Sequence, residues 1–364
     1  MKIKHIVAAL EAWAPRSLQE DYDNCGLQTG DPEAEVDSAL VCLDCTEEVV
    51  EEAVRHGCGL IISHHPVIFK GLKSLVAKTY VERTVLAALR HGISLYAMHT
   101  NLDNVASGVN AEIANRLGIK PLQVLDPKAG QLRKLVVFVP LSHAEVVRTA
   151  LFSAGAGHIG NYSECSFGTE GSGTFLAGEG TDPFVGKAQE RHTEPEVRLE
   201  VVYRTWNEAS VLAAMGSAHP YEEVAFDVLP LLNKDADTGS GLLGEWEKPL
   251  EEREFLDRLK TVFGLRNLRH TRLLGRPVQR VALCGGSGAF LLSRAKALKA
   301  DAFITGDLKY HQYFDADGDL LLADIGHYGS EQFTMHLVQR RLGEVFPTFA
   351  VRLTETVTDP IYHH

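Results

Sequence analysis

Short apolar runs alternate with longer stretches of helical periodicity over the first third of the chain. The runs at residues 39–44, 59–63 and 93–98 have the length and near-continuous apolar character of buried strands. The stretches at 46–56 and 79–90 place apolar residues on one face and are each followed by glycine, which predicts helices. Strands separated by helices of this length pair in parallel, with the helices on the faces of the sheet. The pattern therefore predicts an α/β fold with a mainly parallel sheet.

The pattern changes over residues 128–236. Strands are expected at 135–140 and 197–203, with two short strand-like pieces in the glycine-rich stretch 155–180 between them, and a last strand ends at Leu229. Helices are expected at 142–154 and near 207–218. Strand, helix, two strands, helix, strand is the order of a ferredoxin-like α+β domain. We therefore expect residues 128–236 to form a separate domain inserted into the chain.

The α/β pattern resumes after residue 240. Three further strands and a final helix are expected at 281–284, 301–305, 320–325 and 328–342. The glycine-rich stretch 285–290 lacks the lysine of a P-loop and the full dinucleotide-binding fingerprint. We interpret it as a tight turn from a strand into a helix, with its backbone suited to contact an anion. Two α/β halves with mainly parallel sheets, residues 1–127 and 237–364, are thus expected to form one core.

Composition narrows the classes of function. The 364-residue chain carries 36 Lys and Arg against 48 Asp and Glu, a formal net charge of -12. This balance argues against nucleic-acid binding, which needs clustered cations. The six cysteines are scattered, and the Cys42–Cys45 pair has no second pair at zinc-ribbon spacing. Without a convincing signal peptide or an apolar stretch of transmembrane length, we expect a cytoplasmic protein that binds no membrane.

The chemistry-bearing residues gather where predicted strands end. Ligands of open parallel sheets bind at the carboxyl ends of the strands, and the polar residues at those ends are His64, His65, His99, Asp103, Asp307, His327 and Glu331. Imidazole and carboxylate donors without thiolates suit Zn, Mn, Fe or Ni ions. His327 and Glu331 are four residues apart at a helix start and share one face, and Glu331 could bridge two ions.

Each of these residues has a plainer interpretation when it is considered alone. Adjacent strand residues point to opposite faces, so His64 and His65 would diverge unless Pro66 bends the chain. Asp103 is typical of a turn or a helix cap, and Glu331 suits a helix N-terminus as a charge alone. Their joint occurrence at one end of the predicted sheet favours a metal site.

Three segments resemble the signatures of the Nif-three-like dinuclear metal proteins, often labelled GTP cyclohydrolase I type-two homologues. They are residues 59–66, 99–103 and 324–331, and residues 22–27 and 305–311 are similar to further motifs of that family. The resemblance implies that His64, Asp103 and Glu331 hold one divalent ion and that His65, His327 and Glu331 hold another. It also implies a homohexamer, and an inserted domain similar to PII and CutA proteins over 128–236, with its motifs at 157–162 and 219–224.

Two functions remain open at this point. The first is a metal-dependent hydrolase, such as a GTP cyclohydrolase, with metal-bound water as the nucleophile and two ions of Zn, or of Fe, Mn or Ni, per chain. His99 and His311 would transfer protons, and Asp44, Asn101 and Asp307 would orient the metal ligands. The second is a non-enzymatic metal-binding regulator or ligand-sensing ring, with the inserted domain as sensor or gate. Either would take a small-molecule ligand such as a nucleotide.

Overall fold

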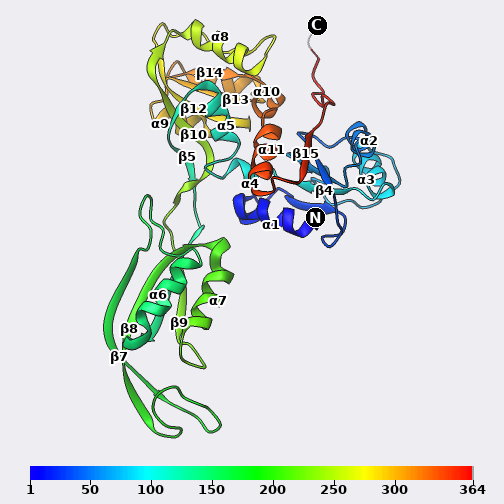
Figure 1. Cartoon of the computed structure of the whole chain (residues 1–364). Helices are drawn as coiled ribbons and strands as arrows, with labels where there is room; N and C mark the ends of the chain where they lie inside the picture. Colours follow the sequence, from blue (N-terminus) through cyan, green and yellow to red (C-terminus); the bar gives the residue numbers. More distant parts are fainter. Residues whose placement is uncertain (363–364) are drawn as a thin grey trace. The chain divides into compact units, whose positions relative to one another are not determined.

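The computed structural model describes residues 1–362, which form two compact units (Figure 1). Of the described residues, unit 1 contains 1–127 and 237–362, and unit 2 contains 128–236. The fold is mixed α/β with three sheets in the described residues. Among those residues, none of the helices reaches the length and apolar character that crossing a bilayer requires.

The first sheet of unit 1 contains the early strands of the chain. Its order is β1 (Gly26–Thr29), β4 (Ser94–Ala97), β3 (Leu60–Ser63), β2 (Ser38–Cys42) and β15 (Ala350–Leu353). The β15–β2, β2–β3 and β3–β4 pairs are parallel, and β1 pairs with β4 antiparallel. Strands β2, β3 and β4 lie where the apolar runs predict strands.

Both faces of this sheet are covered, which explains why its strands are apolar on both sides. Leu40, Ile61 and Leu95 pack against the first pair of helices, α2 (Glu47–Arg55) and α3 (Tyr80–Arg90). The opposite side chains join a larger core with α1 (Ile3–Trp13) and α11 (Thr334–Val345). The N-cap residues of α2 and α3 are Thr46 and Thr79, whose hydroxyls accept hydrogen bonds from backbone N–H groups of the first turn.

The second sheet of unit 1 contains the late strands. Its order is β11 (Arg269–His270), β14 (Leu321–Asp324), β13 (Ala302–Gly306), β12 (Val278–Ser287), β10 (Asp235–Leu250) and β5 (Lys120–Lys128). The pairs β12–β13 and β13–β14 are parallel, whereas β10–β12 and β11–β14 are antiparallel. Helices α5 (Val109–Leu117) and α8 (Glu252–Phe263) contribute to the core shared with the first sheet. The two halves therefore share one apolar core.

Three predicted elements of the late half differ in the structure. Strand β12 continues through Gly285 and Gly286 to Ser287, because the register against β13 shifts between Leu283 and Ser287 and absorbs the glycines. The expected final helix is broken into α10 (His327–Glu331) and α11. Similarly, the helix expected after the glycines is a short helix α9 (Leu292–Ala297), preceded by a single 3₁₀ turn.

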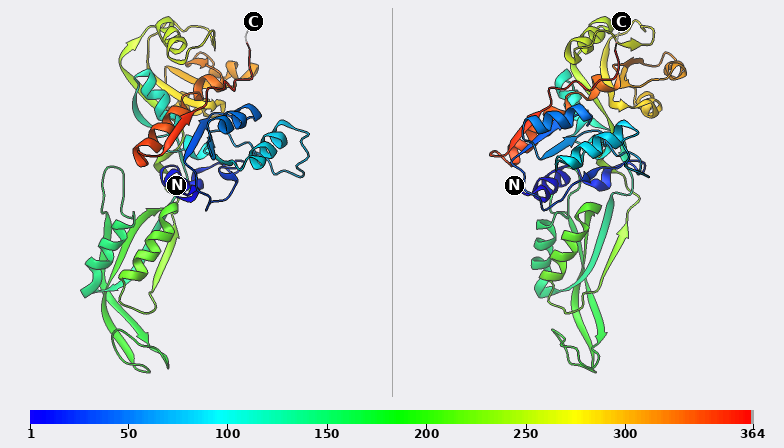
Figure 2. Two further views of the ribbon diagram at one scale, coloured as in Figure 1. Left: turned by 45° about the vertical axis from the view of Figure 1, so that its right-hand side comes forward. Right: turned by 90° about the vertical axis from the view of Figure 1, so that its right-hand side faces the viewer.

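Unit 2 contains an antiparallel sheet with two helices on one face (Figure 2). Its elements are, in chain order, β6 (Leu132–Pro140), α6 (Ala144–Ser153), β7 (Ser166–Leu176), β8 (Arg191–Arg204), α7 (Glu208–Ala218) and β9 (Phe226–Pro230). The sheet order is β7, β8, β6, β9, and every pair is antiparallel. The two short pieces expected at 155–180 are instead one strand of 11 residues, β7, because β8 supplies its full ladder despite the glycines.

A buried carboxylate holds the segment after β15 against α2. Glu52 accepts hydrogen bonds from the Thr354 hydroxyl at 2.6 Å, the Glu355 backbone N–H at 2.7 Å and the Thr356 hydroxyl at 2.7 Å. Burial raises the pKa of the Glu52 carboxyl, but these donors outweigh burial and hold that pKa below its ordinary value. The stabilisation is therefore present at neutral pH and is lost as the pH falls below about 4 toward the depressed value.

The Glu52→Gln variant is expected to lose about 2 kcal/mol of unfolding free energy at pH 7, because the neutral amide accepts these bonds more weakly. The deficit should shrink at acid pH, because the unfolded wild-type chain then binds a proton at Glu52 more readily than the folded chain does. Urea denaturation at pH 7 and at pH 3 measures both values. The control is Glu51→Gln, an exposed change on the same helix. A deficit that is the same at both pH values would contradict this account.

Candidate metal centre

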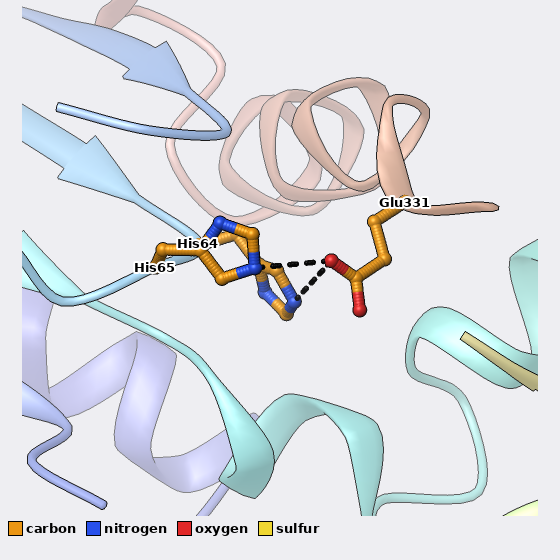
Figure 3. A group of neighbouring side chains, drawn as sticks. All are labelled: His64, His65 and Glu331. Atoms are coloured by element: carbon orange, nitrogen blue, oxygen red, sulfur yellow. Dashed lines mark hydrogen bonds and ion pairs between the residues drawn. The ribbon is translucent and has the colours of Figure 1, made fainter. Parts of the chain in front are cut away.

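Three imidazoles from two parts of unit 1 converge on one buried carboxylate, that of Glu331. Figure 3 shows two of them, His64 and His65, beside Glu331. His64 and His65 follow β3, while His327 and Glu331 lie on α10 after β14. Glu331 Oε2 lies 3.0 Å from His65 Nε2, 3.0 Å from His327 Nε2 and 3.7 Å from His64 Nε2. His64, His65 and Glu331 form a candidate metal-binding group, with ligand atoms all within 4.8 Å of one another.

Backbone and side-chain hydrogen bonds hold the chain after β3 so that the rings of His64 and His65 both lie beside Glu331. The backbone N–H groups of His64 and His65 donate to the carbonyls of Cys42 and Leu43, which continues the pairing with β2 beyond the strand end. The Ser63 hydroxyl donates to the His65 carbonyl at 2.8 Å. The two rings lie 4.9 Å apart and are tilted by 49°. The divergence expected of strand neighbours is thereby avoided.

Each of the three imidazoles is fixed through its other ring nitrogen. His64 Nδ1 donates to the Met98 carbonyl at 2.7 Å, which leaves Nε2 as the ligand atom. His65 Nδ1 donates to Asp44 at 2.8 Å, and His327 Nδ1 donates to Asp307 at 2.7 Å. Partners of this kind set the tautomer and the orientation of metal-ligating histidines. Asp44 and Asp307, which the sequence names as residues that orient metal ligands, thus lie against the rings of His65 and His327.

A second carboxylate, Asp103, lies beside His64. Asp103 ends the short helix α4 (Thr100–Asp103), and its Oδ1 lies 3.7 Å from His64 Nε2. Among the described residues, both atoms are buried without a hydrogen-bond partner. Buried polar atoms without a partner are rare in proteins, and a place for a bound ion is one of the reasons for them. Burial, together with the nearby charge of Glu331, raises the pKa of Asp103 to about 7.

The electrostatics of this cluster favour bound positive charge. Burial lowers the pKa values of His65 and His327, but the adjoining carboxylates outweigh burial and raise them to about 10 and about 9. Burial raises the pKa of Glu331, yet the neighbouring imidazoles hold it well below its ordinary value. In the metal-free chain, protons on the imidazoles compensate the buried carboxylate. Divalent cations would take the place of those protons.

The donor set fits divalent ions. Donors bound to one tetrahedral zinc ion at about 2.0–2.1 Å lie roughly 3.3 Å from one another. Four pairs of an Nε2 atom and a carboxylate oxygen are 3.0 to 3.7 Å apart here, and His65 Nε2 lies 3.1 Å from His327 Nε2. The close donor pairs fall into two triplets that share Glu331: one with His64 and Asp103, the other with His65 and His327.

The two proposed proton-transfer residues lie in different surroundings. The His99 ring centroid is 5.4 Å from that of His64 and 5.3 Å from that of His65. His311 is exposed on the 3₁₀ turn Tyr310–Ala316, and its described ring contacts are with Tyr310 and Phe314. None of the contacts described for residues 1–362 joins His311 to the cluster. The described contacts therefore place His99 beside the cluster and do not place His311 there.

Asn101 holds the segment before α4 through its side-chain hydrogen bonds. Its side-chain oxygen accepts from the His99 backbone N–H at 3.0 Å, and its NH₂ group donates to the Ala14 carbonyl at 2.7 Å. In the described residues, its hydrogen bonds reach none of the five predicted ligands. A role of Asn101 in orienting a metal ligand therefore stays a prediction, because strand-end position indicates where a residue lies and not where its side chain points.

Sequence reasoning missed two residues that shape the site. Asp23 is fully buried and accepts a hydrogen bond from His99 Nδ1 at 2.8 Å. Burial raises the pKa of Asp23, but His99 and its other donors outweigh burial and hold it far below its ordinary value. Gly286 has φ +60° and faces Glu331, and a Cβ there would lie 2.4 Å from Glu331 Oε1. The only indication of Gly286 in the sequence is the glycine-rich stretch 285–290, whose pattern predicts a turn.

A cavity of about 940 Å³ reaches the cluster from one side. His327 and Asp307 lie in its wall, and part of the lining comes from the C-terminal segment that includes Val357 and Tyr362. The same segment supports the cluster, because the Thr358 hydroxyl donates to Asp44 Oδ2 at 2.8 Å. A small molecule in this cavity would lie next to His327.

Comparison with known proteins decides the family. The family model for Duf34/NIF3 (NGG1p interacting factor 3) matches residues 1–360. The chain belongs to the Duf34/NIF3 family. Two relatives, from Halalkalibacterium halodurans and Bacillus subtilis, both carry the name GTP cyclohydrolase 1 type 2 homolog. The first is 40% identical over 88% of this chain and 87% of the relative, and the second is 37% identical over 98% and 97%.

A solved structure supports the same assignment. The Bacillus cereus protein related to NIF3 superimposes with a TM-score of 0.87 at 36% identity, covering 100% of this chain and 99% of that one. The family expected from the sequence and the mixed α/β fold are therefore confirmed.

The Asp307→Asn variant is expected to lower zinc affinity by about 10–100-fold, because the amide no longer secures His327 as the carboxylate does. Asp307 is half exposed, so the fold should tolerate the change. A competition titration against a chromophoric chelator measures the affinity. The matched control is Asp315→Asn, an exposed change on the neighbouring 3₁₀ turn. If both variants bind zinc as wild type does, His327 needs no such partner and the assigned role of Asp307 is wrong.

Proposed function

We propose that this NIF3-family chain is a metal-dependent hydrolase holding two divalent ions, of Zn or of Fe, Mn or Ni. The proposed ligands are His64, Asp103 and Glu331 for one ion, and His65, His327 and Glu331 for the other. The convergence of three imidazole Nε2 atoms on Glu331, beside the unpartnered Asp103 Oδ1, carries the proposal. When bound, such ions supply an activated water and polarise a substrate oxygen.

The chain's own residues would supply proton transfer. Asp23 accepts a hydrogen bond from the Nδ1–H group of His99. The Nε2 atom of the same ring therefore remains available to exchange a proton with a reacting group. The Thr100 hydroxyl and backbone N–H also donate to Asp23, which fixes the carboxylate in place. His99 lies at ring-contact distance from His64 and His65 without being one of the proposed ligands. It is therefore the proton-transfer residue of this proposal.

The finer features of the family remain part of the proposal. The β6–α6–β7–β8–α7–β9 order and the antiparallel sheet support a ferredoxin-like, PII/CutA-like inserted domain over residues 128–236. By the family resemblance we also propose a cytoplasmic homohexamer. GTP is the first substrate to test, because the relatives carry the name GTP cyclohydrolase 1 type 2 homolog.

Turnover of GTP and of p-nitrophenyl phosphate by the zinc-loaded full chain tests the hydrolase assignment. Replacing His99 with glutamine is expected to lower kcat by about 10²–10⁴-fold, because that is the usual contribution of a positioned acid or base. Its metal content should stay that of wild type. His311→Gln is the control and should leave kcat unchanged. A fully loaded wild type that turns over neither substrate, or equal kcat values for the two variants, would contradict the proposal as stated.

A further inference from the structure

Unit 2 contains a cavity of its own, with a volume of about 670 Å³. It lies between strand β7, the segment that follows β7, and residues 221–225, and all of its lining belongs to unit 2. Ligand pockets for small molecules commonly have volumes of about 300–1,000 Å³. Four aromatic side chains line the cavity: Phe138, Phe175, Phe184 and Tyr221.

The rings are close enough to enclose a small molecule. The ring centroid of Tyr221 lies 6.2 Å from that of Phe175 and 6.3 Å from that of Phe184, with interplanar angles of 60° and 49°. The segment that carries Phe184 is tied to the opposite wall, because the Asp182 backbone N–H donates to Glu222 Oε2 at 3.2 Å. The aromatic wall is thus formed without a ligand.

A buried carboxylate completes this wall. Glu196 on β8 is only 8% exposed, and its Oε1 accepts the hydroxyl hydrogen of Tyr221 at 2.9 Å. Its Oε2 lies over Gly173 of β7, where any Cβ would come within 2.1 Å of it. Burial and the hydrogen bond to Glu196 raise the pKa of Tyr221, so the phenol remains a donor. Glycine at 173 is therefore what allows the carboxylate to lie in the cavity.

The charged residues of the cavity lining determine which charge a ligand should carry. The ionisable residues of the wall are one arginine, Arg198, and four glutamates, Glu170, Glu196, Glu222 and Glu223. The Arg198 guanidinium is already paired with Glu200 at 2.9 Å. An anion such as a phosphate would meet a negative potential here, whereas a cation would be attracted by the carboxylates and by the faces of the rings.

We propose that this cavity binds a small organic cation, an amidinium or ammonium group carried on a flat apolar body. Glu196 would accept the hydrogen bonds of the cation, and Phe175, Phe184 and Tyr221 would enclose the body. The cavity lies in unit 2, and the inference does not depend on the proposed metal chemistry.

Three probes of one shape and different charge test the inference on the full chain. They are benzamidine, which is cationic, benzamide, which is neutral, and benzoate, which is anionic. Isothermal titration should show saturable binding of benzamidine, weaker binding of benzamide and none of benzoate. Glu196→Gln should weaken benzamidine about tenfold or more, because a charge-assisted hydrogen bond becomes a neutral one. Gln keeps an oxygen for the Tyr221 hydroxyl, so the wall should remain folded.

Two further variants make the test specific. Phe184→Ala should also weaken benzamidine, since it removes a ring while leaving Glu196 in place. Glu190→Gln, an exposed change outside the lining, should have no effect. Benzamidine binding no tighter than that of benzoate, or unchanged by Glu196→Gln, overturns the inference. A third result would also overturn the inference: benzamidine does not bind, and the Glu196 and Phe184 variants have a changed sedimentation coefficient. The cavity would then be a contact between copies of the chain.

Discussion

Glu331→Gln is expected to lower zinc affinity by more than about 100-fold. A residue that only hydrogen-bonds a metal ligand contributes roughly 10–100-fold to metal affinity, and Glu331 is itself a proposed ligand, so its loss should cost more. Glu331 Oε2 lies within 3.7 Å of all three imidazole Nε2 atoms and would belong to both ions. Metal analysis of the reconstituted protein should therefore show loss of both ions rather than of one. Removal of the carboxylate also removes one of the two carboxylates that raise the pKa of His65, the other being Asp44, and one of the two that raise the pKa of His327, the other being Asp307.

The matched control for this prediction is Glu344→Gln. Glu344 is an exposed residue of α11 and lies outside the cluster. Its loss should leave the zinc content at the wild-type value. A Glu331→Gln protein that keeps two ions per chain, or that loses one and keeps the other at full affinity, would show that this carboxylate is not shared.

Gly286→Ala is expected to disrupt the same site without removing any ligand. An alanine Cβ would lie 2.4 Å from Glu331 Oε1 and 3.3 Å from His327 Cε1, distances at which Glu331 must move. Because Glu331 is buried and α10 is packed against β12 and β13, the carboxylate has little room to move. Zinc affinity should fall more than about tenfold, a loss like that from disturbing an outer partner of a ligand. Zinc affinity and urea denaturation are the measurements.

Gly264→Ala separates the clash from backbone strain. Gly264 ends α8 with φ +63°, close to the +60° of Gly286, but a Cβ there would meet nothing within 4 Å. Both alanine variants should therefore lose about 1–2 kcal/mol of unfolding free energy from the left-handed backbone. Only the change at Gly286 should lower zinc affinity. Equal zinc affinities for the two variants would show that Glu331 does not depend on the space at Gly286.

The ligand candidates were predictable because the fold rule and the residue chemistry agree. His64 and His65 follow a strand whose apolar character is unmistakable, and His327 and Glu331 follow another. The sequence also indicated Asp44 and Asp307, and their hydrogen bonds to His65 and His327 are present in the structure. Separations of more than 260 residues along the chain are closed by the core that the two halves share.

Other features depended on direction and packing, which a single sequence does not specify. Asn101 and His311 stand in the expected segments, yet Asn101 turns toward the His99 backbone and His311 lies exposed. Strand β7 was concealed by its glycines, because their lack of side chains removes the alternation that marks a strand. Gly286 belongs to β12 rather than to a turn, since a register shift absorbs it. Its role is evident only once Glu331 is seen facing it.

The most direct test of the central claim is anomalous diffraction at the zinc edge from crystals of the zinc-loaded chain. The account predicts two peaks per chain, both in contact with Glu331, one also contacting His64 and Asp103 and the other His65 and His327. A single peak, or zinc bound only at residues outside these five, would contradict the claim that the two halves of the core hold a pair of ions.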